Sequence, residues 1–337
     1  MALKDKKKVS ELLNLALNEI LCDDPNALII GEDISDPYGG AFKVTHSLST
    51  NFPASIIQTP ISEQGFIGLA TGLAMKGFKP IVEIMFGDFL TLIVDNLINS
   101  TSKFHFFDTK RYDINVMVRT AVGGGRSYGP VHSQSLEKLF FGWPGIELYS
   151  TSLITSPYKV LKNCYNSKAP VKILIEQKAD YAKQIIEEDN LKNIFLSVEH
   201  ENNNYSILKN TSNDNDVYYL FISYGGTIER IIDVTRNIFE ESEIFSKILF
   251  FSKIYPVDIN ECCDLIQSAK KIIIIEDGYS DCGWGSYFIS EIIRSNKVDI
   301  NLNSIKILGP KMLPIPANPK KEKEHFQNVE SILNEIR

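Results

Sequence analysis

The sequence lacks the marks of several large classes of protein. Its 337 residues contain 35 Lys and Arg against 42 Asp and Glu, so it lacks the basic excess that nucleic-acid-binding proteins show. Its wholly apolar runs, such as 272–275, are far shorter than the about 20 residues that a membrane-spanning helix needs. We therefore expect neither a nucleic acid nor a membrane among its partners.

The sequence also has few cysteines and no pattern of a signal peptide. Its five cysteines show neither metal-ligand nor redox spacing, and Cys262 and Cys263 are adjacent rather than separated by two residues. The basic start, 1–8, leads into an amphipathic segment instead of the apolar core of a signal peptide. These absences predict a cytoplasmic protein with reduced thiols.

What is present is the pattern of an α/β protein. Hydrophobic content of 44% and charged content of 23% are typical of globular chains, and the length suits two domains. Short apolar runs alternate with helical patterns, which predicts a parallel sheet covered by helices. The predicted strands are 27–30, 80–84, 115–119 and 171–175, and the predicted helices include 10–21 and 88–104.

A change in composition divides the chain. Residues 182–216 are rich in Asn, Asp, Glu and Lys, which predicts a solvated connector. A second alternation follows in 217–337, with strands predicted at 217–223, 247–251 and 271–275, so we expect a smaller α/β domain there. The mixed charges of 318–324 predict the start of a solvated helix.

Glu63 stands just before a helical stretch that is unusually rich in glycine. Gly65, Gly68 and Gly72 recur on one face of that stretch, and Gly77 is placed to end it. A glycine inside a helix costs up to about 1 kcal/mol relative to alanine, so three of them indicate close approach of another helix. Glu63 would then lie at the edge of a tightly packed, intrachain or intersubunit, junction. The alternative is that its carboxylate only stabilises the helix N-terminus.

A glycine-rich loop, 123–135, follows the third predicted strand and contains His132. Residues 125–129 match the GxSxG nucleophile elbow, but Ser127 is several residues from the strand and Pro130 follows the match, so a hydrolase is the weakest interpretation. The loop matches neither a phosphate-binding loop nor GxGxxG. Either it presents His132 for proton transfer, or it is a surface loop whose histidine bonds the backbone.

Two aromatic residues, Phe86 and Phe89, flank the turn after the strand at 80–84. Open α/β sheets bind ligands at the carboxyl ends of their strands, where two rings can hold a planar group. Core packing is the alternative for either ring. Asp88, between them, is expected to cap the next helix.

Taken in order, these segments resemble the β subunit of the thiamine diphosphate-dependent decarboxylating component of 2-oxoacid dehydrogenases, of the pyruvate and acetoin type, in the transketolase-like superfamily. The resemblance implies a pyrimidine-binding domain over 1–181, a connector over 182–216 and a transketolase C-terminal domain over 217–337. The matching segments cover nearly the whole chain: 28–33, 40–45, 59–68, 83–89, 124–135, 144–145, 275–278, 283–285 and 313–316.

The resemblance also implies roles for single residues. Glu63 matches the glutamate that hydrogen-bonds N1′ of the thiamine aminopyrimidine, and Phe89, with Phe86 beside it, matches the aromatic residue that packs on that ring. His132 matches the loop histidine that faces the substrate or the lipoyl group. Glu32, with Asp33, matches an acidic pair near the dimer interface and is expected close to the cofactor. Glu63 and His132 are therefore the predicted catalytic residues.

A motif that is missing indicates a partner. In the family, the α subunit holds the diphosphate through Mg²⁺ with a Gly-Asp-Gly motif, and this sequence contains none. The resemblance therefore implies that this chain supplies no metal ligand and forms half of a site. The complete enzyme would be a heterotetramer of two α and two β subunits, with a lipoyl acyltransferase as a further partner.

Three segments depart from the family pattern, namely 104–111, 125–130 and 251–258. They leave the substrate and the acceptor open, so three hypotheses stand. The chain is a 2-oxoacid dehydrogenase subunit that passes an acyl unit to lipoamide, or half of a split transketolase or acyloin-forming enzyme that uses an aldehyde or sugar. The third hypothesis is a non-catalytic subunit that stabilises its α partner.

Overall fold

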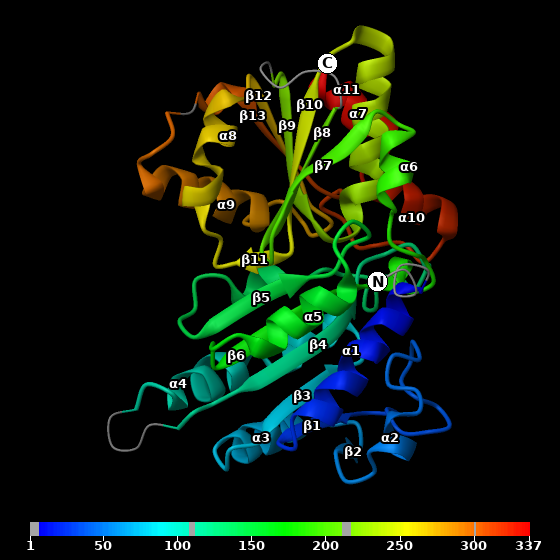
Figure 1. The fold of residues 1–337 in the computed structure, drawn as a ribbon, viewed down its shortest axis with the longest axis vertical. Helices are drawn as coiled ribbons and strands as arrows, with labels where there is room; N and C mark the ends of the chain where they lie inside the picture. The colour runs from blue at the N-terminus through cyan, green and yellow to red at the C-terminus, as the bar shows by residue number, and fades with distance from the viewer. Residues whose placement is uncertain (1–6, 108–111, 211–216, 300) are drawn as a thin grey trace.

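The computed structural model describes residues 7–107, 112–210, 217–299 and 301–337. Most of the basic start and parts of the 104–111 and 182–216 segments lie outside the described residues. The described residues form two α/β domains, each built around one sheet (Figure 1). The predicted fold class is therefore confirmed.

The first sheet has the strand order β11-β5-β6-β4-β3-β1-β2. Its strands from the first domain pair in parallel. The near-complete burial of β1, β3, β4 and β6 explains why these strands are apolar runs in the sequence. The exception is β11, which comes from the second domain and pairs antiparallel with β5. The strands are β1 (Ala27–Gly31), β2 (Ile56–Gln58), β3 (Lys79–Ile84), β4 (Val116–Val122), β5 (Ile146–Ser150), β6 (Val171–Gln177) and β11 (Lys253–Tyr255).

Helices cover both faces of this sheet because alternate strand residues point to opposite sides. Ile29 and Met117 share a buried cluster with α1 (Val9–Asp23) and α5 (Pro157–Asn166), which cross the sheet in Figure 1. Ile30 and Val118 share the other cluster with α3 (Glu63–Ala74). Shorter helices are α2 (Leu48–Asn51), η3 (Glu137–Phe140) and η4 (Lys178–Asp180).

The predicted helix over 88–104 is not a regular α-helix. It consists of a 3-10 segment, η1 (Gly87–Leu92), a π-helical segment, η2 (Asn96–Thr101), and the short α4 (Ser102–Phe104). Thr101 Oγ1 donates a hydrogen bond to the carbonyl of Asn96, 3.1 Å away, and lies 2.8 Å from Thr71 Oγ1 of α3. Side-chain bonds of this kind compete with regular helical bonds, and the periodicity of the apolar residues does not reveal them.

The second sheet has the order β13-β12-β9-β10-β8-β7. The first four strands are parallel, and β8 and β7 form an antiparallel hairpin at the edge. That hairpin lies inside 182–216, so part of the expected connector belongs to the second sheet. Its polar composition has a physical reason, because most of β7 is exposed at the sheet edge. The strands are β7 (Leu196–Glu201), β8 (Tyr205–Asn210), β9 (Tyr219–Tyr224), β10 (Ser246–Phe251), β12 (Lys271–Ile275) and β13 (Ile305–Leu308).

The second sheet is also covered on both faces (Figure 1). One face packs against α7 (Ile228–Ser242) and α11 (Val329–Ile336), and the other against α8 (Cys263–Ser268) and α9 (Trp284–Ser295). The remaining helices are α6 (Glu188–Lys192), η5 (Gly225–Thr227), η6 (Ile259–Cys262), η7 (Leu302–Ser304) and α10 (Pro319–His325).

Helix α10 is the helix expected at 318–324, and Asn318 caps it by accepting hydrogen bonds from the backbone amides of Lys320 and Lys321. The expectation that it is solvated holds only in part, because Glu322 and His325 are buried. Glu322 accepts hydrogen bonds from a loop of the first domain. This helix therefore packs against the neighbouring domain.

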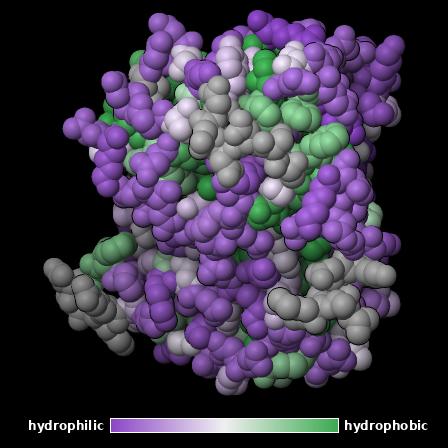
Figure 2. All heavy atoms as spheres, turned by 45° about the horizontal axis from the view of Figure 1, so that its top comes forward, coloured by the Kyte–Doolittle hydropathy of each residue, from purple (hydrophilic) through white to green (hydrophobic). Residues whose placement is uncertain are grey.

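The surface in Figure 2 is largely hydrophilic, with apolar residues in small separate patches. Within the described ranges, no helix has the length and hydrophobicity to cross a bilayer. All five cysteines are free thiols, as the absence of paired spacing predicts.

Candidate active site

The predicted site residues all follow strands of the first sheet. Glu32 follows β1, Glu63 follows β2, Phe86 follows β3, and the loop with His132 follows β4. Because β2, β1, β3 and β4 are parallel neighbours in that order, their carboxyl ends meet at one edge. This edge is where open α/β sheets bind ligands.

At the β3 and β4 part of this edge, His132 packs against both predicted aromatic residues. Its ring centroid lies 4.7 Å from that of Phe86 and 5.4 Å from that of Phe89, both edge to face. Phe86 and Phe89 are themselves 5.9 Å apart, and Tyr128 packs edge-on against Phe86. The three residues Phe86, Phe89 and His132, half-buried, form what we call the aromatic cluster.

At the β1 and β2 part of the edge, two carboxylates lie close together. Glu63 is the first residue of α3 and is only 7% exposed. Burial raises the pKa of Glu32, and the charges of Glu63 and Asp33 raise it further. The hydrogen bond from the Thr59 amide to the Gly31 carbonyl, 3.0 Å, holds the two segments side by side.

The glycine face of α3 does not meet the helix that the sequence predicts within this chain. A Cβ atom added to Gly68 or to Gly72 would meet nothing within 4 Å among the described residues. Leu69, on the same helix, is 45% exposed, and Ile61 just before it is 82% exposed. The face is therefore open in the described chain, so the close approach indicated by the glycines would require another subunit.

Lys178 is a site residue that the sequence reasoning missed. It follows β6, is fully buried, and its Nζ donates a hydrogen bond to the carbonyl of His132. The same ammonium lies 5.4 Å from the centre of the Phe86 ring. Burial lowers its pKa to about 8, although the charges of Asp88 and Glu322 oppose that change. The sequence does contain a signal that could have indicated Lys178, because a lysine directly after an apolar strand is unusual.

Asp88 does not cap the helix as expected, because Phe86 occupies the N-cap position. Instead its Oδ1 accepts a hydrogen bond from Gln134 Nε2 at 2.8 Å. Its Oδ2 is buried and has no hydrogen-bond partner among the described residues. Asp88 thus fastens the loop that contains His132, together with Lys178.

The far end of that loop is held by Glu322 of α10. The Gly125 amide donates to Oε1 at 3.0 Å, and the Ser127 amide and Oγ donate to Oε2 at 2.9 and 3.2 Å. Ser127 lies in irregular backbone and no helix begins directly after it, so the strand-turn-helix context of a nucleophile elbow is missing. No sequence pattern indicated Glu322, since 195 residues separate it from Ser127.

The arrangement combines a buried acid, a half-buried histidine and flat apolar rings at one sheet edge. Such a set can hold a planar heterocycle and exchange protons with it. Among the residues that the structure describes, no three His, Cys, Asp or Glu side chains gather as a metal site.

Comparison with known proteins identifies the family. The family described as "Transketolase, pyrimidine binding domain" matches residues 5–183, more than half of the chain. Pyruvate dehydrogenase E1 component subunit beta of Rickettsia bellii is 24% identical, over 98% of this chain and 97% of its own. The same-named protein of Staurastrum punctulatum is 28% identical, over 84% and 83%.

Two further comparisons agree. The acetoin:2,6-dichlorophenolindophenol oxidoreductase subunit beta of Cupriavidus necator is 24% identical, over 94% of this chain and 92% of its own. A solved structure described as a split gene transketolase, an inactive beta4 tetramer, has the same fold. Its TM-score is 0.73 at 15% identity, and the match covers 98% of this chain and 97% of that one. The resemblance stated from the sequence is confirmed: the chain belongs to the transketolase pyrimidine-binding family and is related along its length to the β subunits of pyruvate dehydrogenase E1 and acetoin oxidoreductase.

Proposed function

We propose that this chain is the β subunit of a thiamine diphosphate-dependent 2-oxoacid dehydrogenase of the cytoplasm. It decarboxylates a 2-oxo acid and passes the acyl unit to lipoamide, in a heterotetramer with two α subunits. The observation that carries the proposal is the position of Glu63, buried at the first turn of α3 beside an open glycine face. Similarity over the full length of the E1 β relatives supports it.

The residues present fit one half of thiamine diphosphate. A buried carboxyl group and two aromatic rings suit an uncharged aminopyrimidine. The carboxylates of Glu32 and Glu63 would repel a diphosphate, and no cluster of metal ligands accompanies them in the described part of the chain. We therefore assign the diphosphate and Mg²⁺ to the α subunit, which would cover the open face of α3.

Each residue then has a stated task. Thiamine diphosphate, when bound, supplies a carbon nucleophile and an electron sink for decarboxylation. Glu63 would hydrogen-bond the pyrimidine ring nitrogen, shielded from water, and Phe89 with Phe86 would hold the ring. His132 would donate a proton to the carbonyl oxygen of the substrate. Lys178 would keep its carbonyl, and so the loop, in place.

The test is Glu63→Gln in the enzyme assembled with an α subunit that carries the Gly-Asp-Gly motif. We expect turnover of pyruvate and branched 2-oxo acids to fall by about 100-fold or more, because the proton exchange is lost. Glu240→Gln, on the exposed surface of α7, is the matched control and keeps full turnover. If Glu63→Gln also keeps full turnover, the chain is a stabilising subunit and the proposal is wrong.

The acceptor requires a separate measurement. Acylation of a purified lipoyl domain by the wild-type assembly supports the dehydrogenase. If a ketose or an acyloin forms from an aldehyde without any lipoyl protein, the acceptor is an aldehyde or a sugar instead of lipoamide. In that case the role of Glu63 stands and the dehydrogenase assignment fails.

A further inference from the structure

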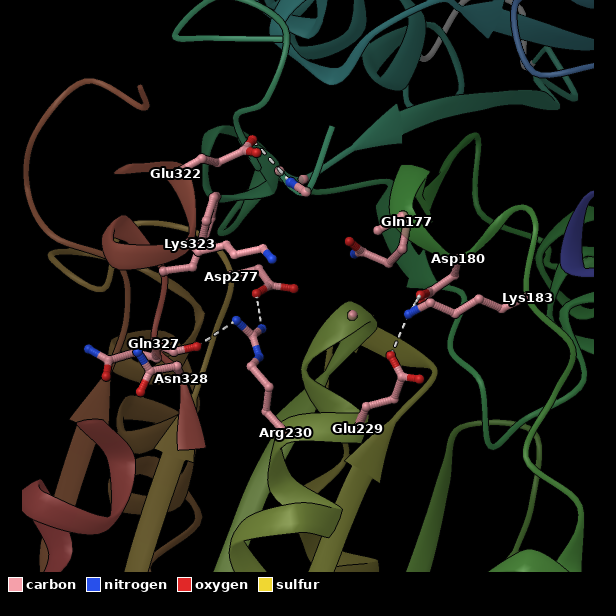
Figure 3. A pocket seen from close by; sticks show the side chains of 16 residues that line it. Gln177, Asp180, Lys183, Glu229, Arg230, Asp277, Glu322, Lys323, Gln327 and Asn328 are labelled. Carbon is pink, nitrogen blue, oxygen red and sulfur yellow. Dashed lines mark hydrogen bonds and ion pairs between the residues drawn. The ribbon is translucent and has the colours of Figure 1, made fainter. Parts of the chain in front are cut away.

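A cavity of about 480 Å³ lies between the two domains (Figure 3). Its walls come from the carboxyl ends of four strands: β4 and β6 of the first sheet, and β9 and β12 of the second. The carboxyl ends of parallel strands from the two sheets thus face each other, and this is where such folds bind ligands. The volume lies in the range of small-molecule sites.

Two ion-paired groups build the walls. Arg230 of α7 pairs with Asp277 and donates to the Gln327 carbonyl at 2.9 Å. Lys183 bridges Asp180 Oδ1, at 3.0 Å, and Glu229. These groups set two cations against three carboxylates, so they fix the shape of the cavity and leave one carboxylate in excess.

Asp180 is the group that these pairs do not satisfy. Asp180 is only 3% exposed, and its Oδ2 has no hydrogen-bond partner within the described ranges. Burial raises its pKa to about 6, against the opposing charge of Lys183. A buried polar oxygen without a partner is uncommon in native proteins. A donor on a ligand in the cavity would supply that partner.

The facing wall carries a free cation. Lys323 of α10 is exposed to solvent, and Figure 3 shows its ammonium pointing into the cavity opposite Gln177 and Asp180. No ion pair joins it to another described residue. Gln177 is buried and adds an amide to the wall on which Asp180 lies. Phe326 and Ala179 give the cavity its apolar surface.

We propose that this cavity binds a small molecule of the α-amino acid class. Its carboxylate pairs with Lys323, its ammonium donates to Asp180 and Gln177, and its side chain packs on Phe326. The chemistry follows from two groups on opposite walls, the solvent-exposed ammonium of Lys323 without an ion-pair partner among the described residues and the buried Oδ2 of Asp180 without a hydrogen-bond partner there.

The cavity has a direct connection to the loop that contains His132. Gly123, Gly124 and Gly125 line it, and so does Glu322, which holds Gly125 and Ser127. None of Glu63, Phe86, Phe89 and His132 lines it. Occupancy therefore acts on the position of the loop, and the amino acid is an effector of turnover. The effect on turnover rests on the proposed function, whereas the binding of the amino acid does not.

The test measures binding to the full-length chain, alone and assembled with an α subunit. The twenty L-amino acids are tried singly by thermal shift, and those that raise the unfolding temperature are measured by calorimetry. We expect at least one to bind, and Lys323→Met to weaken it by about tenfold or more. Lys320→Met, an exposed lysine of the same helix outside the cavity lining, is the matched control and binds normally.

Asp180→Asn provides a second, independent variant. It keeps a polar group of the same shape but loses the carboxylate, and we expect the amino acid to bind this variant more weakly than it binds wild type. The proposal is overturned if no amino acid binds, or if Lys323→Met and Asp180→Asn bind like wild type. If inorganic phosphate binds with the same dependence on Lys323 and amino acids do not, the assigned class is wrong. Each outcome is independent of the Glu63→Gln result.

Discussion

Arg119→Met tests whether the buried charges of the first sheet are coupled as the structure indicates. Arg119 lies on β4 between two carboxylates on neighbouring strands, and its Nε donates to Glu176 Oε1 at 2.8 Å. It also pairs with Glu83 on β3. The side chains of Arg119, Glu83 and Glu176 are only 3%, 9% and 0% exposed. Removing the arginine would leave two buried carboxylates without their cationic partner.

Breaking a buried ion pair costs about 3 to 5 kcal/mol, because the remaining charge is left without compensation in the protein interior. Here one substitution removes the partner of two carboxylates, so we expect a loss of at least about 3 kcal/mol in the free energy of unfolding. The variant reduces this loss by binding protons. Burial already raises the pKa of Glu83 while Arg119 lowers it, so the variant raises it further.

The sign of the pH dependence follows from that change. A carboxyl group whose pKa is higher in the folded than in the unfolded state stabilises the fold fully below its unfolded pKa. That stability is lost as the pH rises through the folded pKa. The deficit of Arg119→Met relative to wild type is therefore largest near pH 8 and shrinks toward pH 5.

Urea unfolding at both pH values, followed by circular dichroism, measures the deficit in unfolding free energy. If the two domains unfold separately, amide exchange in β4 measures the stability of the first domain alone. Lys192→Met removes an exposed ion pair with Glu188 on α6 and is the control, with an expected change below about 1 kcal/mol. Adding Glu176→Gln to Arg119→Met should restore part of the stability. A loss below about 1 kcal/mol at pH 8, or a deficit that grows toward pH 5, would refute the reasoning.

Three further predictions concern the site edge and the domain interface. Burial lowers the pKa of Lys178 to about 8, so we expect wild-type turnover of the assembled enzyme to fall above about pH 8. Lys178→Met should lower turnover with an unchanged far-UV spectrum and should lack this fall; a pH profile like that of wild type would contradict the positioning role. Burial raises the pKa of Glu276 from 4.5 to about 7. The unfolding free energy of wild type should therefore decline by up to about 3 kcal/mol between pH 5 and 7. Urea titrations of Glu276→Gln should lack the decline that Glu276 causes. A Cβ on Gly124 would lie 2.3 Å from the Phe326 ring. Gly124→Ala should therefore lower the unfolding temperature of the isolated chain, measured by calorimetry, by about 3 °C or more. Gly68→Ala, whose Cβ would meet no described atom within 4 Å, should not lower it.

Several buried parallel strands were predictable from the sequence because their burial on both faces makes them continuous apolar runs. Thus 27–30, 80–84 and 171–175 fall within β1, β3 and β6. The edge hairpin of β7 and β8 was not predictable in this way, since most of β7 is exposed and therefore has the polar composition of a loop. Nor was β11, whose partner β5 lies in the other domain.

The sequence by itself indicated candidate residues for a site and the need for a partner. The order of its motifs indicated Glu63, Phe89 and His132, and the absence of Gly-Asp-Gly indicated a partner. Tertiary structure alone decided what these residues touch. Contacts between distant segments depend on strand order, and a local pattern does not encode that order. Parallel pairing brings His132 onto Phe86, and domain packing brings Glu322 to Gly125 across 197 positions. The open face of α3 and the cavity beside Asp180 follow from the same packing.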